Sequence, residues 1–302
     1  MHFLSQSLSK TTLAIGALIL GSAALAFAPI FVRLADTSPA ASGFWRMALA
    51  SPVLWLWVAW EARRSGGARS GSQAAAAPPI PWVLLTLAGA FFAADIAALH
   101  GAIVRTSVAN ASLELNLAPL WVTLGAWLLF RQRVSRWFLL ALLITIAGAA
   151  MTIGPNFHGA PTALAGDALG VLAGVFYACY LLTIKSVTAS VSTARIMAVN
   201  TSAAALLLAP YALMSGGALV PQSGAGWLLL AGLAVGVHVA GQSLVAYGFA
   251  ALPAQLSSVN LLLQPVFAAL YAWILLSEAM LPLQMAGALV VLLGIYLAKR
   301  GS

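Results

Sequence analysis

One pattern of five helices is written twice along this chain, and the second copy begins near residue 156. Residues 112–148 match residues 258–294 with an offset of 146 positions. Because each copy holds an odd number of membrane spans, the second copy enters the bilayer upside down relative to the first. Inverted repeats of this kind are typical of secondary transporters. Identical residues define the match: Ser112, Leu115, Leu117, Pro119, Leu124, Ala126, Trp127, Leu129, Leu143 and Gly148 correspond to Ser258, Leu261, Leu263, Pro265, Leu270, Ala272, Trp273, Leu275, Leu289 and Gly294.

The composition places these helices in lipid. Hydrophobic residues make up 62% of the 302 residues and charged residues 7%, a balance that no soluble surface accommodates. At about 20 residues per span, the chain holds ten spans with short loops and no soluble catalytic domain. We therefore predict an all-α integral membrane protein built from two inverted five-helix repeats, residues 1–155 and 156–302. The predicted spans are residues 12–32, 39–60, 82–103, 107–130, 134–153, 164–184, 193–213, 226–249, 255–276 and 281–298.

Basic residues are distributed unevenly between the two sides of the predicted membrane. Lys and Arg accumulate in the cytoplasmic loops of membrane proteins. With the N-terminus inside, only Arg33 and Arg105 face outward, whereas the cytoplasmic set comprises Lys10, Arg63, Arg64, Arg69, Arg131, Arg133, Arg136, Lys185, Arg195, Lys299 and Arg300. We expect a multi-pass protein of the bacterial cytoplasmic (inner) membrane with both termini in the cytoplasm. The net charge of +8 follows from this sorting, and because no basic run is interleaved with aromatic residues, we expect no nucleic-acid partner.

The charges of equivalent loops support the inversion independently of the sequence match. Arg131, Arg133 and Arg136 follow the fourth span, whereas Glu278 and no basic residue follow the ninth. Three arginines likewise follow the second span, and residues 215–225 after the seventh span contain none. The two copies are therefore predicted to lie in opposite orientations.

Several residues in the second half form a recognisable pattern: Ala251, Pro253, Pro265, Leu276, Ser277, Glu278, Gly287 and Gly294, with Arg46 and residues 109–119 as first-half counterparts. With this pattern the chain resembles, over nearly its whole length, the drug/metabolite transporter superfamily and its ten-helix EamA branch of bacterial metabolite exporters. The resemblance implies export of small metabolites, and likeness to the YddG-type exporters implies aromatic amino acids. Gln132 replaces the acidic residue usual after the fourth helix, at a helix end. The first span holds no acidic residue, so the glutamate mechanism of the small multidrug antiporters does not transfer.

Three charged residues fall within predicted spans, where hydrocarbon disfavours them. Polar groups in a span are costly unless they are paired or face water. Arg46, Asp95 and Glu114 lie at similar depth, on the order of 10 Å below the outer surface at about 1.5 Å per helical residue. One interpretation is a structural ion pair between Arg46 and Glu114. The other keeps Asp95 or Glu114 free to take a proton or to bind an amino group, and the sequence leaves the protonation of both open.

Polar residues also form stripes on the two repeat-related helices. Asn110 and Glu114 share one face of the fourth span, and Asn260 and Gln264 share one face of the ninth. Pro119 and Pro265 cannot donate the helical hydrogen bonds that residues 115 and 261 would accept. Paired helix interruptions at matching positions indicate a binding site near the midplane.

Other spans add polar and aromatic candidates for substrate binding: His100 in the third, Tyr177 and Tyr180 in the sixth, His238 and Gln242 in the eighth. Amide, imidazole and phenol groups beside aromatic rings suit a small zwitterion that carries a ring. Each has an alternative structural role, because a single Tyr or His near a helix end is commonly an interfacial anchor.

Enzymatic motifs are not found in the sequence. No His, Cys and carboxylate cluster has metal-ligand spacing and no glycine-rich loop precedes a Lys-Ser or Lys-Thr pair, so we expect no cofactor, no metal and no direct use of ATP. The prediction is a secondary transporter that exports small metabolites, most of all aromatic amino acids, by alternating access. Hydrophobic cationic drugs or nucleosides are the alternative substrates, and an intramembrane enzyme or a membrane scaffold is the alternative class. Substrate identity, proton coupling versus facilitated diffusion, direction and oligomeric state stay open.

Overall fold

The computed structural model describes residues 2–66, 80–103, 105, 115–153, 164–277 and 281–301. Within these ranges the chain forms helices joined by short turns, without a strand. The first half contains α1 (His2–Leu25), α2 (Ala28–Leu34), α3 (Pro39–Gly66), α4 (Trp82–Ile103), α6 (Ala118–Phe130) and α7 (Arg136–Ile153). The second half contains α8 (Leu164–Val187), α9 (Thr193–Met214), α10 (Gly224–Gly232), η2 (Leu233–Gln242), α11 (Ser243–Ala251), α12 (Ala254–Asn260), α13 (Leu263–Leu276) and α14 (Pro282–Gly301).

Several predicted spans are composed of two or three helical segments. α1 and α2 together form the first span, α10, η2 and α11 the eighth, and α12 and α13 the ninth. Among the described residues, eight segments are long and apolar enough to cross a membrane. The other two of the ten predicted spans correspond to α3, which carries Arg46 and Glu61, and to α6, which has 13 residues. The predicted all-α membrane fold is confirmed, although Asn110, Glu114 and Glu278 lie outside the described residues.

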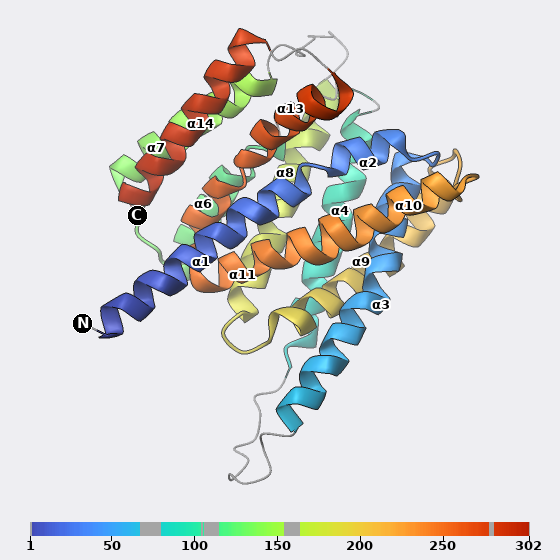
Figure 1. The fold of residues 1–302 in the computed structure, drawn as a ribbon, viewed down its shortest axis with the longest axis horizontal. Helices are drawn as coiled ribbons and strands as arrows, with labels where there is room; N and C mark the ends of the chain where they lie inside the picture. The colour runs from blue at the N-terminus through green and yellow to red at the C-terminus, as the bar shows by residue number, and fades with distance from the viewer. Residues whose placement is uncertain are drawn as a thin grey trace.

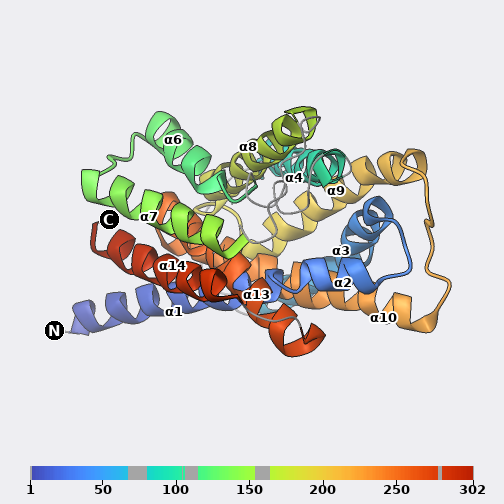
Figure 2. The same ribbon diagram turned by 90° about the horizontal axis from the view of Figure 1, so that it is seen from above.

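The helices pack according to the symmetry of the repeat. α3 packs on its repeat equivalent α9, and α7 packs on its equivalent α14. α6 of the fourth span packs on α12 of the equivalent ninth span. α4 packs on α8, and the equivalent segments of the other repeat, η2 and α11, pack on α1 in the same way. Similarly, α6 packs on α8, and its equivalent α13 packs on α1. Figure 1 shows α7 and α14 lying side by side, and Figure 2 shows the same pair from above, with the start of α1 and the end of α14 on one side of the molecule.

Glycines permit the closest of these contacts. A Cβ on Gly148 of α7 would lie 2.6 Å from the backbone nitrogen of Val291 and 2.8 Å from the carbonyl oxygen of Gly287. Gly294, the repeat equivalent of Gly148, lies in the same way against Thr145, the equivalent of Val291. Small residues let membrane helices approach closely, and here they do so symmetrically, as an approximate twofold axis between α7 and α14 requires.

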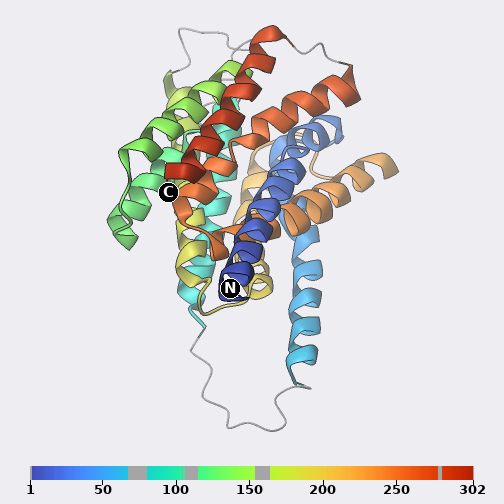
Figure 3. The ribbon, with the colours of Figure 1, turned by 60° about the vertical axis from the view of Figure 1, so that its left-hand side comes forward.

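The two ends of the bundle differ in charge. One end, which we call the basic end, holds Lys10 at the start of the first span, Arg63 and Arg64 in the last turn of α3, and Lys299 and Arg300 in the last turn of α14. Figure 3 shows α3 extending beyond the other helices towards this end.

At the opposite end, the turn between α2 and α3 is bonded to the loop between α9 and α10. Asp36 Oδ2 accepts hydrogen bonds from the backbone N–H groups of Gln222 and Ser223, both at 3.0 Å. The N–H of Ser38 donates to the carbonyl of Ala218 at 2.9 Å, and Trp45 Nε1 donates to the carbonyl of Leu219 at 2.8 Å. These contacts, which we call the latch, join the first half of the chain to the second.

Candidate functional site

The ninth span is interrupted at its centre, and the fourth span is interrupted at the equivalent position. α12 ends at Asn260, residues 261 and 262 form a turn, and α13 begins at Leu263. In the first half, residues 116 and 117 form the turn and α6 begins at Ala118. The carbonyls of Leu261 and Leu117 accept bonds from the residues three positions on, each at 2.9 Å. Pro119 and Pro265 occupy the first turns of α6 and α13, where the missing N–H is tolerated.

A cavity of about 50 Å³ lies between these two interruptions. Its walls come from both repeats and from α8: Leu115, Asn116, Ala118, Pro119, Tyr177, Leu181, Ser258, Leu261, Leu262 and Gln264. This volume is well below the range of about 300–1,000 Å³ that small-molecule sites occupy, so the space does not fit a metabolite as it stands. The structure therefore describes a closed centre, and binding of a substrate here requires the surrounding helices to move apart.

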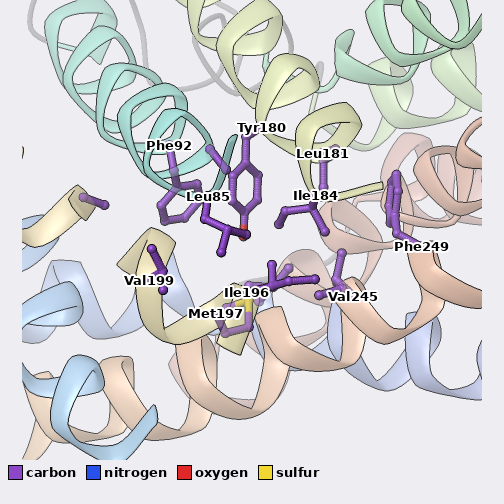
Figure 4. Packing of buried hydrophobic residues seen from close by; sticks show 14 of the residues in the cluster. Leu85, Phe92, Tyr180, Leu181, Ile184, Ile196, Met197, Val199, Val245 and Phe249 are labelled. Atoms are coloured by element: carbon purple, nitrogen blue, oxygen red, sulfur yellow. The ribbon is translucent and has the colours of Figure 1, made fainter. Parts of the chain in front are cut away.

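Aromatic rings continue from this cavity into the centre of the bundle. The ring of Tyr177, which lines the cavity, stacks on that of Tyr180 with 5.9 Å between centroids. Phe92 of α4 lies 4.7 Å from the ring of Tyr180 and 5.6 Å from that of His238. Figure 4 shows the rings of Phe92 and Tyr180 lying side by side between α4 and α8. These four rings form a continuous aromatic wall.

Two buried charges adjoin this wall. The guanidinium of Arg46 lies 5.7 Å from the centroid of the Phe92 ring, within the range of a cation–π contact. Asp95, one helical turn from Phe92 on α4, is 6% exposed and interacts electrostatically with Arg46. Arg46 Nε and Asp95 Oδ1 have no hydrogen-bond partner in the described part of the chain. Buried polar atoms of this kind are normally satisfied, so both groups are suited to bind a polar ligand.

Two amides connect the wall to the cavity. Gln242 Nε2 donates to the hydroxyl of Tyr180 at 3.2 Å, and both Gln242 and Gln264 lie within hydrogen-bonding reach of the Tyr177 hydroxyl. Arg46, Asp95, Tyr177, Tyr180, His238, Gln242 and Gln264, together with Phe92, form what we call the central cluster. The residues come from α3, α4, α8, η2 and α13, and hence from both halves of the chain.

His238 lies on η2, a π-helical segment of the eighth span. Its Nε2 pairs with Thr201 Oγ1 at 2.8 Å, and Thr201 in turn donates to Asn200 Oδ1 at 3.4 Å. π-helical segments are frequent at functional sites. Thr201 and Asn200 are not among the candidates from the sequence. Their signal in the sequence is a run of three polar residues, 200–202, within an otherwise apolar stretch of the seventh span.

Two candidates lie apart from the cluster. His100 stacks on Tyr211 of α9 at 6.4 Å, five residues beyond Asp95 towards the end of α4. Asn260 donates its side-chain amide to the carbonyl of Leu256 in its own helix at 2.7 Å. Asn110 and Glu114 lie outside the described residues, so the Arg46–Glu114 ion pair stays a prediction.

The described residues contain no group of three His, Cys, Asp or Glu side chains placed to hold a metal. An inverted pair of helical repeats that encloses buried charges and aromatic rings at broken helices defines a multi-pass membrane carrier. This is the class of protein that the fold and the site indicate together.

Comparison with known proteins assigns the family. The chain belongs to the EamA-like transporter family, which matches residues 12–154 and again residues 164–300. The pseudopaline exporter CntI of Pseudomonas aeruginosa is 28% identical over 69% of this chain and 72% of its own length. An uncharacterized transporter of Archaeoglobus fulgidus is 26% identical over 89% of this chain and 91% of its own. A crystal structure with 19% identity aligns over 97% of both chains with a TM-score of 0.77, which shows a shared fold.

Proposed function

We propose that this transporter exports small zwitterionic metabolites, above all aromatic amino acids, from the bacterial cytoplasm by alternating access. The observation that carries the proposal is the placement of one buried cation, Arg46, and one buried carboxylate, Asp95, beside the aromatic wall of the central cluster. The name of the Pseudomonas aeruginosa relative supports export as the direction.

An amino acid complements this arrangement group by group. Its carboxylate pairs with the guanidinium of Arg46 and its ammonium with Asp95, so each buried charge gains a partner. Its ring stacks on the tyrosines of α8. The amides of Gln242 and Gln264 supply the remaining hydrogen bonds, as in other ligand sites where a few polar groups orient a mainly apolar contact.

The transport cycle requires the centre to open to each side in turn. We propose that the halves, residues 1–155 and 156–302, rock against one another and separate the interruptions at residues 116–117 and 261–262. The basic end faces the cytoplasm, since Lys and Arg accumulate there. Both termini are then cytoplasmic and the latch lies on the outer side of the inner membrane.

The second candidate substrates are hydrophobic cationic drugs or nucleosides, and of these the cationic drugs draw support from the site. The unpartnered Oδ1 of Asp95 favours these drugs, because a buried carboxylate attracts a positive charge without help from Arg46. The two substrate classes differ in their need for Arg46, because only a substrate that carries a carboxylate pairs with its guanidinium.

Efflux from liposomes tests the proposal. Purified protein is reconstituted, the vesicles are loaded with radiolabelled amino acids one at a time, and efflux is followed with and without a pH gradient. We expect saturable efflux of Phe, Tyr or Trp that related amino acids inhibit, and the pH arm separates proton exchange from facilitated diffusion.

Two variants decide between the substrate classes. Asp95→Asn keeps the shape of the side chain and removes its charge, and it should abolish efflux of zwitterions and cations alike. Arg46→Gln should abolish efflux of amino acids only. No efflux of any amino acid by the wild-type protein would refute the substrate assignment, and efflux of a cationic dye by Arg46→Gln would establish the second class.

A further inference from the structure

A second cavity, of about 570 Å³ and open to the outside over much of its boundary, lies between α3, α9 and the η2–α11 segment. Its volume falls in the range of about 300–1,000 Å³ that small-molecule sites occupy. None of its lining residues belongs to the central cluster. We call it the α3–α11 cavity.

This cavity lies at the basic end of the bundle. Trp57 and Glu61 line it from the last three turns of α3, which ends at Gly66. Thr193, the first residue of α9, and Tyr247, near the end of α11, line it from the other helices. These residues lie near helix ends close to Arg63 and Arg195, whereas Val239 and Ala240 line the cavity from η2 in the middle of the eighth span. The cavity therefore lies in the cytoplasmic half of the bundle in the topology proposed above.

The lining combines two aromatic residues with one carboxylate. Trp57 is half-buried and Tyr247 is 43% exposed, so neither ring is fully covered by other parts of the protein. The carboxylate of Glu61 accepts a 2.6 Å hydrogen bond from the hydroxyl of Ser192. This arrangement suits an amphipathic molecule whose ring enters between Trp57 and Tyr247 and whose polar group stays near Glu61.

Ser243 adds an unsatisfied hydroxyl to the wall. The residue is 7% exposed, and its Oγ has no hydrogen-bond partner in the described ranges. Leaving a buried donor or acceptor unpaired is destabilising, and a polar atom of a bound molecule, such as an indole N–H or a phenol, would remove that cost. An acyl chain has no group that could bond to Ser243.

The η2–α11 segment separates this cavity from the central cluster. His238 and Gln242 of η2 face the cluster, whereas Ala240 and Ser243 face the cavity. Gln242 and Ser243 are consecutive residues, so a molecule in the cavity lies one helix wall away from Tyr180. The π-helical hydrogen-bond pattern of η2 makes this wall the irregular part of the eighth span.

We propose that the α3–α11 cavity is a loading site that binds the ring of an amino-acid-like substrate from the cytoplasm before it reaches the central cluster. The side of the membrane and the substrate class rest on the proposed function. The site itself rests on the cavity, its two aromatic residues and the unpartnered hydroxyl of Ser243.

Protection of a single thiol tests the site without requiring transport. Cys179 is the only cysteine of the chain, so Cys179→Ala provides a thiol-free background into which Ser243→Cys is introduced. The rate of N-ethylmaleimide modification is measured in inside-out membrane vesicles with and without tryptophan. Tryptophan at twice its dissociation constant should slow modification about threefold, because the unoccupied fraction falls as 1/(1 + [L]/Kd).

The thiol-modification assay also includes a control position. Ala250→Cys lies on α11, is exposed and does not line the cavity, so tryptophan should leave its modification rate unchanged. Equal protection at both positions, no protection at Ser243→Cys, or protection by decanoate and not by tryptophan would each overturn the loading site. If Ser243→Cys does not fold, Val239→Cys on the same wall serves in its place.

A second variant links the site to transport. Ala240→Leu adds bulk to the cavity wall at an exposed position. It should raise the KM for tryptophan presented at the cytoplasmic face severalfold and leave the KM at the outer face unchanged. Protection without tryptophan transport would refute the proposed function and keep the loading site, whereas transport with unchanged KM at both faces and no protection would refute the loading site alone.

Discussion

Gln264 and Asn260 lie about one helical turn apart on the ninth span, yet the structure gives their amides different environments. Gln264 lines the central cavity and reaches the Tyr177 hydroxyl. The side-chain amide of Asn260, which is 3% exposed, donates to the carbonyl of Leu256 within α12, and the backbone carbonyl of Asn260 accepts a hydrogen bond from the Ser22 hydroxyl of α1 at 3.3 Å. In the proposed function the amide of Gln264 binds substrate, whereas the amide of Asn260 bonds within the helix that ends at the interruption.

Alanine at these two positions should therefore give different defects. Gln264→Ala removes one hydrogen bond to substrate and should raise the KM for efflux about tenfold with near-normal thermal stability. Asn260→Ala should lower the melting temperature of the purified protein and leave the KM of the folded fraction unchanged. The measurements are efflux kinetics and thermal unfolding in the same detergent. An unchanged KM in Gln264→Ala would show that its amide only packs.

The sequence identifies polar residues in spans more readily than it identifies their partners. Asp95, Tyr180 and His238 are visible because hydrocarbon disfavours them. Phe92 is not visible, since it is one apolar residue among many and its importance comes from lying between Arg46 and Tyr180. The bond from Asn260 to its own helix is also hidden, because the packing around α12 selects that rotamer.

At the scale of helices, the proline positions predict where the backbone is interrupted but not how. Pro265 indicates a break in the ninth span, and the structure has its turn three residues earlier, at residues 261 and 262. The π-helical register of η2 has no such marker. Residues 233–242 read as ordinary apolar helix, and the i→i+5 pattern depends on packing against α1 and α3. The hydrophobic periodicity of the sequence therefore predicts where the spans lie, whereas tertiary contacts determine where those spans are irregular.

The α7–α14 contact should be sensitive to single methyl groups. Gly148→Ala places a Cβ within 2.6 Å of the backbone of Val291, where neither backbone can yield without separating the helices. We expect a loss of about 1–3 kcal/mol in unfolding free energy, the usual range for overpacking. Gly16→Ala on α1 is the matched control, because a Cβ there has nothing within 4 Å. Equal stability of the two variants in thermal unfolding would contradict the close crossing.

At the scale of the whole molecule, the two ends of the bundle are held differently. The latch joins the halves at one end through Asp36, Ser38 and Trp45. The basic end instead carries the α3–α11 cavity. Opening towards the latch side thus requires breaking the hydrogen bonds of the latch. At the basic end the halves are joined by the hydrogen bond from Ser192 to Glu61, beside a space that already exists.

The latch should respond to acid. Desolvation acts to raise the pKa of Asp36, but hydrogen bonds from the Ser223 side chain and from the N–H groups of Gln222 and Ser223 outweigh it and hold the pKa below the ordinary value of 3.8. The folded state therefore binds this proton more weakly than the unfolded state. The resulting stabilisation is present above pH 3.8 and is lost as the pH falls through the lowered pKa.

Asp36→Ala isolates this contribution. Wild-type protein should melt at a higher temperature than the variant at pH 6, and the difference should shrink as the pH falls below 3.8. A constant difference between pH 6 and pH 3 would show that the carboxylate charge plays no part in the latch. Faster exchange between the two open states in Asp36→Ala would further connect the latch to the transport cycle.

The orientation of the protein in the membrane determines whether the α3–α11 cavity or the latch faces the cytoplasm. An even number of spans places the start of α1 and the end of α14 on one side, and the proposal that this side is cytoplasmic follows from its basic residues. In the Cys179→Ala background, Ser215→Cys lies in the loop of the latch side and Ala189→Cys in the exposed turn between α8 and α9 at the basic end. A membrane-impermeant maleimide added to intact cells should label Ser215→Cys at once and Ala189→Cys only after permeabilisation. The reverse result would place the α3–α11 cavity outside, so that it would receive substrate on release instead of loading it, and the latch would then guard the cytoplasmic side.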